Sequence, residues 1–281
     1  MAILTKNSAR KAGTDILYGA VIGSSMLIPG VSGGTMAIIL GIYDRLISSV
    51  SGIIKKPKEN LPFLALVFLG GLCGVLLFSR AVLGMIEAFT NECMFFFTGT
   101  VLGSIPLLVR KSGIKISNMY NMIFSLIGII AVFGIRLIPP ASSSGGGVML
   151  IICGIIIAAA MVLPGISTSH ILLILGMYES FWGGLGGGNI DFFLLLGIGG
   201  IIGTLLTAKL TDIAEKRFPC QTYMVIIGFI MTSVYDIFPK EIPTGRLPLY
   251  IILCASGFAA AYIISNIGSR RDKAKEVFSK A

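Results

Sequence analysis

The chain has 281 residues, 55% of them hydrophobic and only 12% charged, with a formal net charge of +9 and a mean hydropathy of +0.92. Soluble domains carry about 25% charged residues, so this composition excludes a soluble protein and indicates one embedded in a lipid bilayer. The basic residues do not indicate nucleic-acid binding, because they gather in short loops between apolar stretches, where they determine membrane topology. The five cysteines are dispersed without CxxC spacing, so neither a metal site nor a disulfide framework is predicted, and no cofactor is expected.

Ten apolar stretches follow a polar, basic cytoplasmic segment at 1–15, in which no cleavable signal peptide is evident. Helices are expected at about 16–28, 34–54, 61–79, 93–109, 119–138, 146–163, 170–186, 192–210, 221–238 and 247–267. A helix needs about 20 apolar residues to span a bilayer. The first stretch is therefore too short to cross alone, and the stretch at 146–163 is also short. A basic cytoplasmic tail is expected at 269–281.

The chain contains an internal duplication. Residues 28–44 read IPGVSGGTMAIILGIYD and residues 163–179 read LPGISTSHILLILGMYE, with Pro29 aligned to Pro164 and Asp44 to Glu179 at a constant offset. Two further blocks match in the same order, GGLCGVLLFSR at 70–80 with GGIIGTLLTAK at 199–209, and GTVLGSIPLLVRK at 99–111 with GFIMTSVYDIFPK at 228–240. The duplication predicts a membrane repeat 1 at 16–138 and a membrane repeat 2 at 148–268, joined by an external linker at 139–147.

Each repeat begins with a short apolar stretch that ends in a Pro-Gly-x-Ser motif. Proline interrupts a helix, so each motif is expected at the turn of a re-entrant hairpin made of two half-helices. The alternative is that each hairpin consists of two full spans with a kink at the motif. In both cases an odd number of crossings per half makes the two repeats inverted relative to each other.

Basic residues support this layout. With the N-terminus in the cytoplasm, the clusters at 6–11, 55–58, 110–115, 209–217 and 270–280 all lie on the cytoplasmic side, which is the positive-inside pattern. The predicted fold class is an all-α polytopic membrane protein with two inverted-topology repeats, each a re-entrant, broken-helix hairpin followed by about three spanning helices. Both termini are expected in the cytoplasm.

Inverted repeats with broken helices place a binding site near the bilayer midplane, between the halves. Here each motif begins a half-helix with unpaired backbone N–H groups and adds hydroxyl or imidazole donors, which suits phosphate or another anion. The alternative is that Gly and Ser only permit close helix packing and cap the following helix. The predicted substrate-binding residues are Pro29, Gly30, Ser32, Gly33, Gly34, Thr35, Pro164, Gly165, Ser167, Thr168, Ser169 and His170.

Charged residues within apolar segments are costly, which makes them functional candidates. Asp44 and Glu179 are repeat mates that each follow a tyrosine, and they are candidates for carrying a coupling proton or for pairing with a cation such as Arg45. The alternative is that both acidic residues anchor their segments at the membrane interface. No catalytic residue is predicted.

The blocks PGVSGGTMAIILGIYDRLI at 29–47 and PGISTSHILLILGMYESF at 164–181 resemble the PopT family of bacterial undecaprenyl-phosphate translocases. The resemblance covers nearly the whole chain. It implies a multi-pass protein of the bacterial plasma membrane that returns undecaprenyl phosphate, or a related polyprenyl-phosphate lipid, from the outer to the inner leaflet for reuse in envelope synthesis. The second motif departs from a glycine-rich pattern at Thr168, Ser169 and His170, but all three side chains can still donate hydrogen bonds.

Two other functions are compatible with the pattern. Helix tips rich in Gly and Ser also suit a small-anion transporter or channel. The motif PGISTSH is superficially similar to the PGxSRSGxT motif of BacA-type polyprenyl-pyrophosphate phosphatases, but Thr168 and Gly33 stand at the position of the required arginine, and the upstream stretches contain no glutamate. The expected partners are the lipid substrate and the bilayer, with no nucleic acid, and a homo-oligomer is compatible with the sequence.

Overall fold

The computed structural model describes residues 2–28, 31–114, 119–137, 146–181, 190–242 and 244–280, and these residues form helices, turns and loops without a strand. The first half comprises α1 (Ala2–Ser25), α2 (Gly33–Ile39), α3 (Tyr43–Ser51), α4 (Pro57–Ala88), α5 (Thr90–Leu102), α6 (Ile105–Ser112) and α7 (Met122–Arg136). The second half comprises α8 (Gly147–Val162), α9 (Thr168–Ile174), α11 (Ile190–Arg217), α12 (Pro219–Ile237) and α13 (Leu247–Lys280). Short 3-10 turns precede α7 and α13.

Five helical stretches are long and apolar enough to cross a membrane, at 57–88, 90–112, 190–217, 219–237 and 247–267, and α7 and α8 are shorter apolar helices. Their outward faces carry large apolar side chains; Leu76 and Leu77 of α4, for example, are 78% and 73% exposed. Such a surface requires contact with lipid. The chain is therefore an all-α, multi-pass membrane protein, which confirms the predicted fold class at this level.

Several helix boundaries differ from the sequence expectation. α1 runs unbroken from Ala2 to Ser25, so the helix begins well before the expected start at about residue 16 and includes basic residues of the N-terminal segment. The expected helix at 34–54 is divided into α2 and α3, and the one at 93–109 into α5 and α6 around Gly103 and Ser104. The expected linker at 139–147 lies mostly outside the described residues.

A Schellman motif explains why the stretch at 34–54 is broken. Gly41 has φ 73°, its N–H bonds to the Ile38 carbonyl, and the N–H of Ile42 bonds to the Ala37 carbonyl. This left-handed glycine terminates α2. The equivalent residues of the second half do the same, because Gly176 has φ 65°, bonds to Leu173, and is followed by Met177 bonded to Leu172.

Helix packing also repeats between the halves. α1 packs along α4 and α8 along α11, while α5 pairs with α13 and α12 with α7. In the first pair an added Cβ on Gly70 would lie 2.1 Å from the Ile16 carbonyl oxygen, and in the second pair one on Gly199 would lie 2.0 Å from that of Ile151. The sequence duplication is thus matched in helix register. The inversion of the repeats across a membrane stays a prediction.

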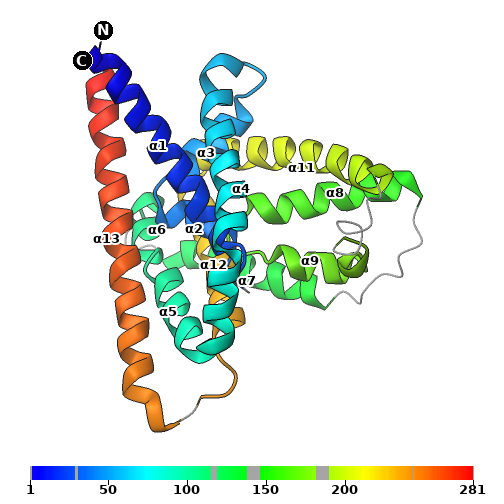
Figure 1. Ribbon diagram of the computed structural model, residues 1–281, viewed down its shortest axis with the longest axis vertical. Coiled ribbons are helices and arrows are strands. Elements are labelled where there is room, and N and C mark those ends of the chain that lie inside the picture. The colour runs from blue at the N-terminus through cyan, green and yellow to red at the C-terminus, as the bar shows by residue number, and fades with distance from the viewer. Residues whose placement is uncertain are drawn as a thin grey trace.

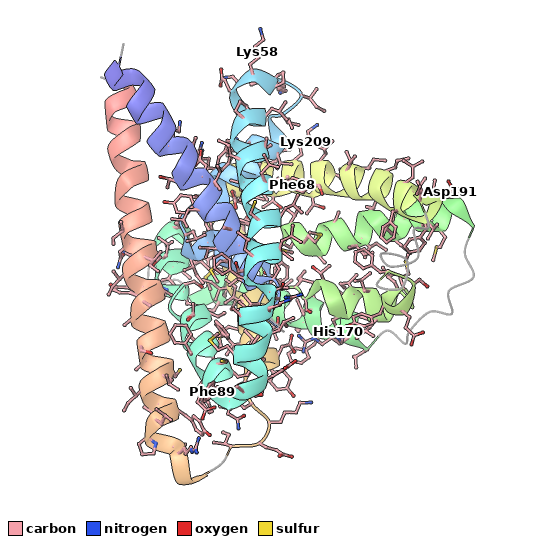
Figure 2. The ribbon with its side chains drawn as sticks, in the orientation of Figure 1. Lys58, Phe68, Phe89, His170, Asp191 and Lys209 are labelled. Carbon is pink, nitrogen blue, oxygen red and sulfur yellow. The ribbon has the colours of Figure 1, made fainter. Side chains whose placement is uncertain are left out.

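Figure 1 shows α1, α4 and α13 running along the long axis of the molecule, whereas α8 and α11 extend across it. Both chain ends lie at the same end of the molecule (Figure 1). Figure 2 shows Lys58, at the start of α4, toward that end and Phe89, after α4, toward the other. The fold therefore brings the two termini to one side. The short helices α2 and α3, which follow the first Pro-Gly-x-Ser motif, pack against α1 and α4 respectively.

Candidate functional site

The two Pro-Gly-x-Ser motifs meet inside the protein. Ser32 is the N-cap of α2, and its Oγ accepts a hydrogen bond from the Thr35 N–H at 3.1 Å. The same oxygen accepts the Gly165 N–H of the second motif at 2.9 Å, and Thr35 Oγ1 accepts it at 3.2 Å. The two hydroxyl oxygens are 2.9 Å apart. We refer to Ser32, Thr35 and Gly165 as the tip junction.

The tip junction is buried and tightly packed. Thr35 is fully buried and Ser32 is 7% exposed. A Cβ on Gly34 would lie 3.0 Å from the Pro164 backbone, and one on Gly165, which has φ 80°, would lie 2.4 Å from the Phe229 carbonyl group. The second motif is therefore pressed between the first motif and α12, and only glycine fits at position 165.

The junction consists of hydrogen-bond donors and hydroxyl groups without a charged side chain. Two backbone N–H groups, of Thr35 and Gly165, point at hydroxyl oxygens, and one hydroxyl donates to the other. Each hydroxyl has one hydrogen and two acceptor lone pairs. One of the two hydroxyl hydrogens is thus used between the hydroxyls, and the other is available to an acceptor.

The other predicted binding residues surround this junction unevenly. Gly33 and Gly34 line a neighbouring cavity, and Ser167 starts α9 in an extended conformation without a side-chain cap. His170 Nε2 is buried and has no hydrogen-bond partner among the residues that the structure describes. Figure 2 shows this residue well below Lys58 along the long axis of the molecule. Pro29, Gly30 and the side chain of Ser169 lie outside the described residues.

The coupling candidates are not paired with one another. Asp44 forms an ion pair with Lys111 of α6. Arg45 instead binds the buried carboxylate of Asp15 on α1 at 2.9 Å and stacks its guanidinium 3.6 Å from the Phe63 ring centroid. The repeat mate of Asp44, Glu179, is exposed. The two halves thus place equivalent acidic residues in different surroundings.

A polar cluster around Asp44 was not predicted from the sequence. Lys111 Nζ, which pairs with Asp44, lies 5.9 Å from the ring centroid of Tyr223 on α12, and Glu215 of α11 lies close enough to interact electrostatically with both Asp44 and Lys111. One oxygen each of Asp44 and Glu215 is buried without a hydrogen-bond partner. The last turns of α11 contained a signal, because Asp212 and Lys216 have the i,i+4 spacing of a helical ion pair, which they form at 2.7 Å.

A cavity of about 740 Å³ lies beside the tip junction. Its walls come from α1 and α4 on one side and α11 on the other, with α2 and α3 between them, and the end of α8 contributes Met161 and Val162. Repeat mates from the two halves face it, namely Gly71 with Gly200, Leu72 with Ile201, and Val75 with Thr204. The cavity therefore lies between the halves. Tyr43, whose hydroxyl donates to the Val162 carbonyl at 3.4 Å, joins α3 to the end of α8.

The model of the undecaprenyl phosphate translocase-like family matches residues 22–247. The chain belongs to this family. It is 28% identical over 246 residues to a polyprenyl-phosphate transporter of Vibrio cholerae, covering 82% of this chain and 79% of that protein. It is 30% identical over 271 residues to a polyprenyl-phosphate transporter of Staphylococcus aureus, covering 89% of this chain and 94% of that protein. No solved structure matches the chain. The family resemblance noted from the two motifs is confirmed.

Proposed function

We propose that this protein moves undecaprenyl phosphate, or a related polyprenyl-phosphate lipid, from the outer to the inner leaflet of the bacterial plasma membrane for reuse in envelope synthesis. The tip junction is the observation that carries the proposal, because two donor-rich motifs from different halves converge there. The names of the Vibrio and Staphylococcus relatives support the lipid class. In this proposal the basic clusters hold both termini in the cytoplasm.

The task of such a protein is to shelter a phosphate within the bilayer. An unpaired ion in an apolar medium costs many kcal/mol by idealised estimates, so the head group needs donors along its route. Hydrogen bonds to a charged acceptor are roughly twice as strong as neutral ones. A phosphate oxygen that takes the place of the hydroxyl acceptors would therefore bind the Gly165 and Thr35 N–H groups more strongly than Ser32 and Thr35 hold them now.

Transport follows if the halves separate at this junction. The lipid head group enters between the motifs from one face, the halves rock, and the head group leaves toward the other face while the junction closes behind it. The proposed binding residues are those that the two motifs supply, including Ser167, Thr168, Ser169 and His170 of the second half. Among the described residues of the two motifs there is no permanently charged cation, so hydrogen bonds alone would hold the phosphate, and it would not be bound too tightly to leave.

Asp44, Arg45 and Glu179 are the proposed coupling residues. Asp44 is the best placed of them, because it bonds to Lys111 and lies within the polar cluster beside α11, which lines the cavity wall. Protonation of this carboxylate would weaken its pairing with Lys111 and free α3 to move. We propose transport without bond cleavage, since hydroxyls and backbone amides bind a phosphate at the junction but supply no activated nucleophile.

The test is undecaprenyl phosphate flipping by purified protein in liposomes, with inorganic phosphate and chloride flux measured in the same vesicles. Saturable lipid movement without ion flux supports the proposal. Ion flux without lipid movement would overturn it in favour of a small-anion carrier, and release of inorganic phosphate from a polyprenyl pyrophosphate would overturn it in favour of a phosphatase.

A further inference from the structure

We infer that the cavity between α4 and α11 holds the part of the prenyl chain nearest to the phosphate while the head group is at the tip junction. This inference rests on the proposed function and adds a second subsite to it. The cavity lies next to the closed junction, because Gly33 and Gly34, which stand between Ser32 and Thr35 in the chain, line it, although Ser32, Thr35 and Gly165 themselves do not. A lipid bound at the junction would therefore have its chain beside or within this space.

The lining selects an apolar occupant. Of the residues that form the cavity wall, Tyr43 and Thr204 are the ones with polar side chains, and no wall residue is charged. Tyr43 already donates its hydroxyl hydrogen to Val162. Phe68 and Ile201 of the wall are exposed, so the space opens on the apolar surface of the protein. A wall of this kind favours a hydrocarbon chain over water or a free anion.

Three glycines of the two long walls, on α4 and α11, face open space and are not explained by helix packing. Gly70, Gly74, Gly199 and Gly203 are each pressed against the backbone of the neighbouring helix, so close packing explains them. Gly71, Gly197 and Gly200 have open space instead. A Cβ on Gly197 or Gly200 would meet no atom within 4 Å, and one on Gly71 would meet only the Gly19 carbonyl oxygen, at 3.6 Å. These three glycines line the cavity and keep it wide.

The volume fits part of a chain. Ligand sites typically have volumes of about 300–1,000 Å³, so 740 Å³ accommodates several isoprene units but not a complete undecaprenyl chain. The remainder of the chain would extend into the bilayer. We therefore assign the cavity to the head-proximal isoprene units, and it is this contact that distinguishes a polyprenyl phosphate from an inorganic phosphate at the same junction.

Photocrosslinking tests this assignment directly. The probe is a polyprenyl phosphate with a diazirine on the isoprene unit nearest the phosphate, added to wild-type protein in liposomes, with the labelled residues identified by mass spectrometry. We expect labelling of Ala37, Ile47 and Val67, which line the cavity and are buried, and we expect undecaprenyl phosphate to compete this labelling away. Labelling confined to lipid-facing residues such as Leu76 and Leu77 would overturn the inference while leaving the proposed function intact.

A second probe and two matched substitutions complete the experiment. An acyl-chain diazirine phospholipid that labels the cavity and is not displaced by undecaprenyl phosphate would also overturn the inference, since the space would then hold bulk lipid. Gly200→Leu should reduce cavity labelling and undecaprenyl phosphate transport at least tenfold. Gly84→Leu, at an equally open position outside the cavity, should change neither. Equal losses in both variants would contradict the assignment, whereas wild-type protein without any lipid movement would refute the proposed function itself.

Discussion

Ser32 is the hub of the tip junction, so its removal should cost more than the removal of the Thr35 hydroxyl. Ser32 Oγ accepts from two backbone N–H groups and bonds to the Thr35 hydroxyl. Thr35 Oγ1 contributes only that last bond and the longer contact of 3.2 Å to Gly165. The two substitutions to compare are Ser32→Ala and Thr35→Val, since each removes one hydroxyl, and valine keeps the shape of threonine.

The structure sets the expected magnitudes. Ser32→Ala removes an N-cap, which costs about 1 kcal/mol, and leaves the Gly165 N–H with its longer bond only, which costs about another 1 kcal/mol. Thr35→Val leaves both N–H groups bonded to Ser32 and should cost about 1 kcal/mol or less. The free energy of unfolding should thus fall by about 2 kcal/mol in the first variant and by about half of that in the second. The double variant should cost less than the sum, because the two hydroxyls bond to each other.

The assay is unfolding of the purified protein by sodium dodecyl sulfate in mixed micelles, combined with lipid flipping in liposomes. Ser104→Ala is the matched control, because Ser104 is fully buried but donates only to the Val101 carbonyl close by in its own segment. In the flipping assay Ser32→Ala should weaken undecaprenyl phosphate binding about tenfold, which corresponds to about 1.4 kcal/mol. A Thr35→Val variant that is as unstable as Ser32→Ala would refute the hub role of Ser32.

Four further predictions use the same two assays. Gly199→Ala should lower the free energy of unfolding by about 1–3 kcal/mol, because its Cβ would lie 2.0 Å from the Ile151 carbonyl oxygen. Gly200→Ala should change the free energy of unfolding by less than about 0.5 kcal/mol, and equal costs in the two variants would contradict the packing argument. Arg45→Gln should lower the free energy of unfolding by about 2–4 kcal/mol, because it leaves the carboxylate of Asp15, whose side chain is 6% exposed, without its cation. Adding Asp15→Asn should restore most of that stability, and a double variant no more stable than Arg45→Gln would contradict the prediction. Asp44→Asn should change the free energy of unfolding by no more than about 1 kcal/mol, since Asp44 and Lys111 are partly exposed. The same variant should abolish the response of lipid flipping to a pH gradient, and an unchanged response would remove Asp44 from the coupling proposal. Ser167→Ala should leave stability within about 0.5 kcal/mol, because Ser167 makes no side-chain cap, yet should slow lipid flipping, and unchanged flipping would remove this side chain from the site.

The sequence was most informative where local chemistry decides the structure. The expected helix at 146–163 corresponds to α8 at Gly147–Val162, and the one at 221–238 to α12 at Pro219–Ile237, because apolar runs bounded by polar or Pro/Gly segments leave little choice of boundary. The break within 34–54 was also encoded locally, by the glycine and the following apolar residue of a Schellman motif. An apolar count alone passes over that signal because Gly41 lies inside an uninterrupted hydrophobic stretch.

The parts of the site that escaped prediction depend on contacts between residues far apart in the chain. Asp44 and Arg45 are adjacent in the sequence, yet one binds Lys111 on α6 and the other Asp15 on α1. Charge alone cannot assign these partners, since several basic and acidic residues are candidates for each. The cavity escaped for the same reason, because whether a glycine packs or faces open space depends on the neighbouring helix. Adjacent glycines such as Gly199 and Gly200 look alike in the sequence and have opposite surroundings.

The asymmetry of the tip junction explains why hydroxyl residues suit it. Thr35 is aligned with His170 in the duplication, so the first motif supplies hydroxyls and the second supplies the backbone N–H of Gly165. In the closed junction these hydroxyls act as acceptors, whereas in the proposed lipid-bound state they must act as donors to a phosphate. A carboxylate could fill only the first role and an ammonium group only the second. Serine and threonine can fill both, so in the proposed transport cycle the same two side chains would hold the halves together without lipid and bind the head group when the halves separate.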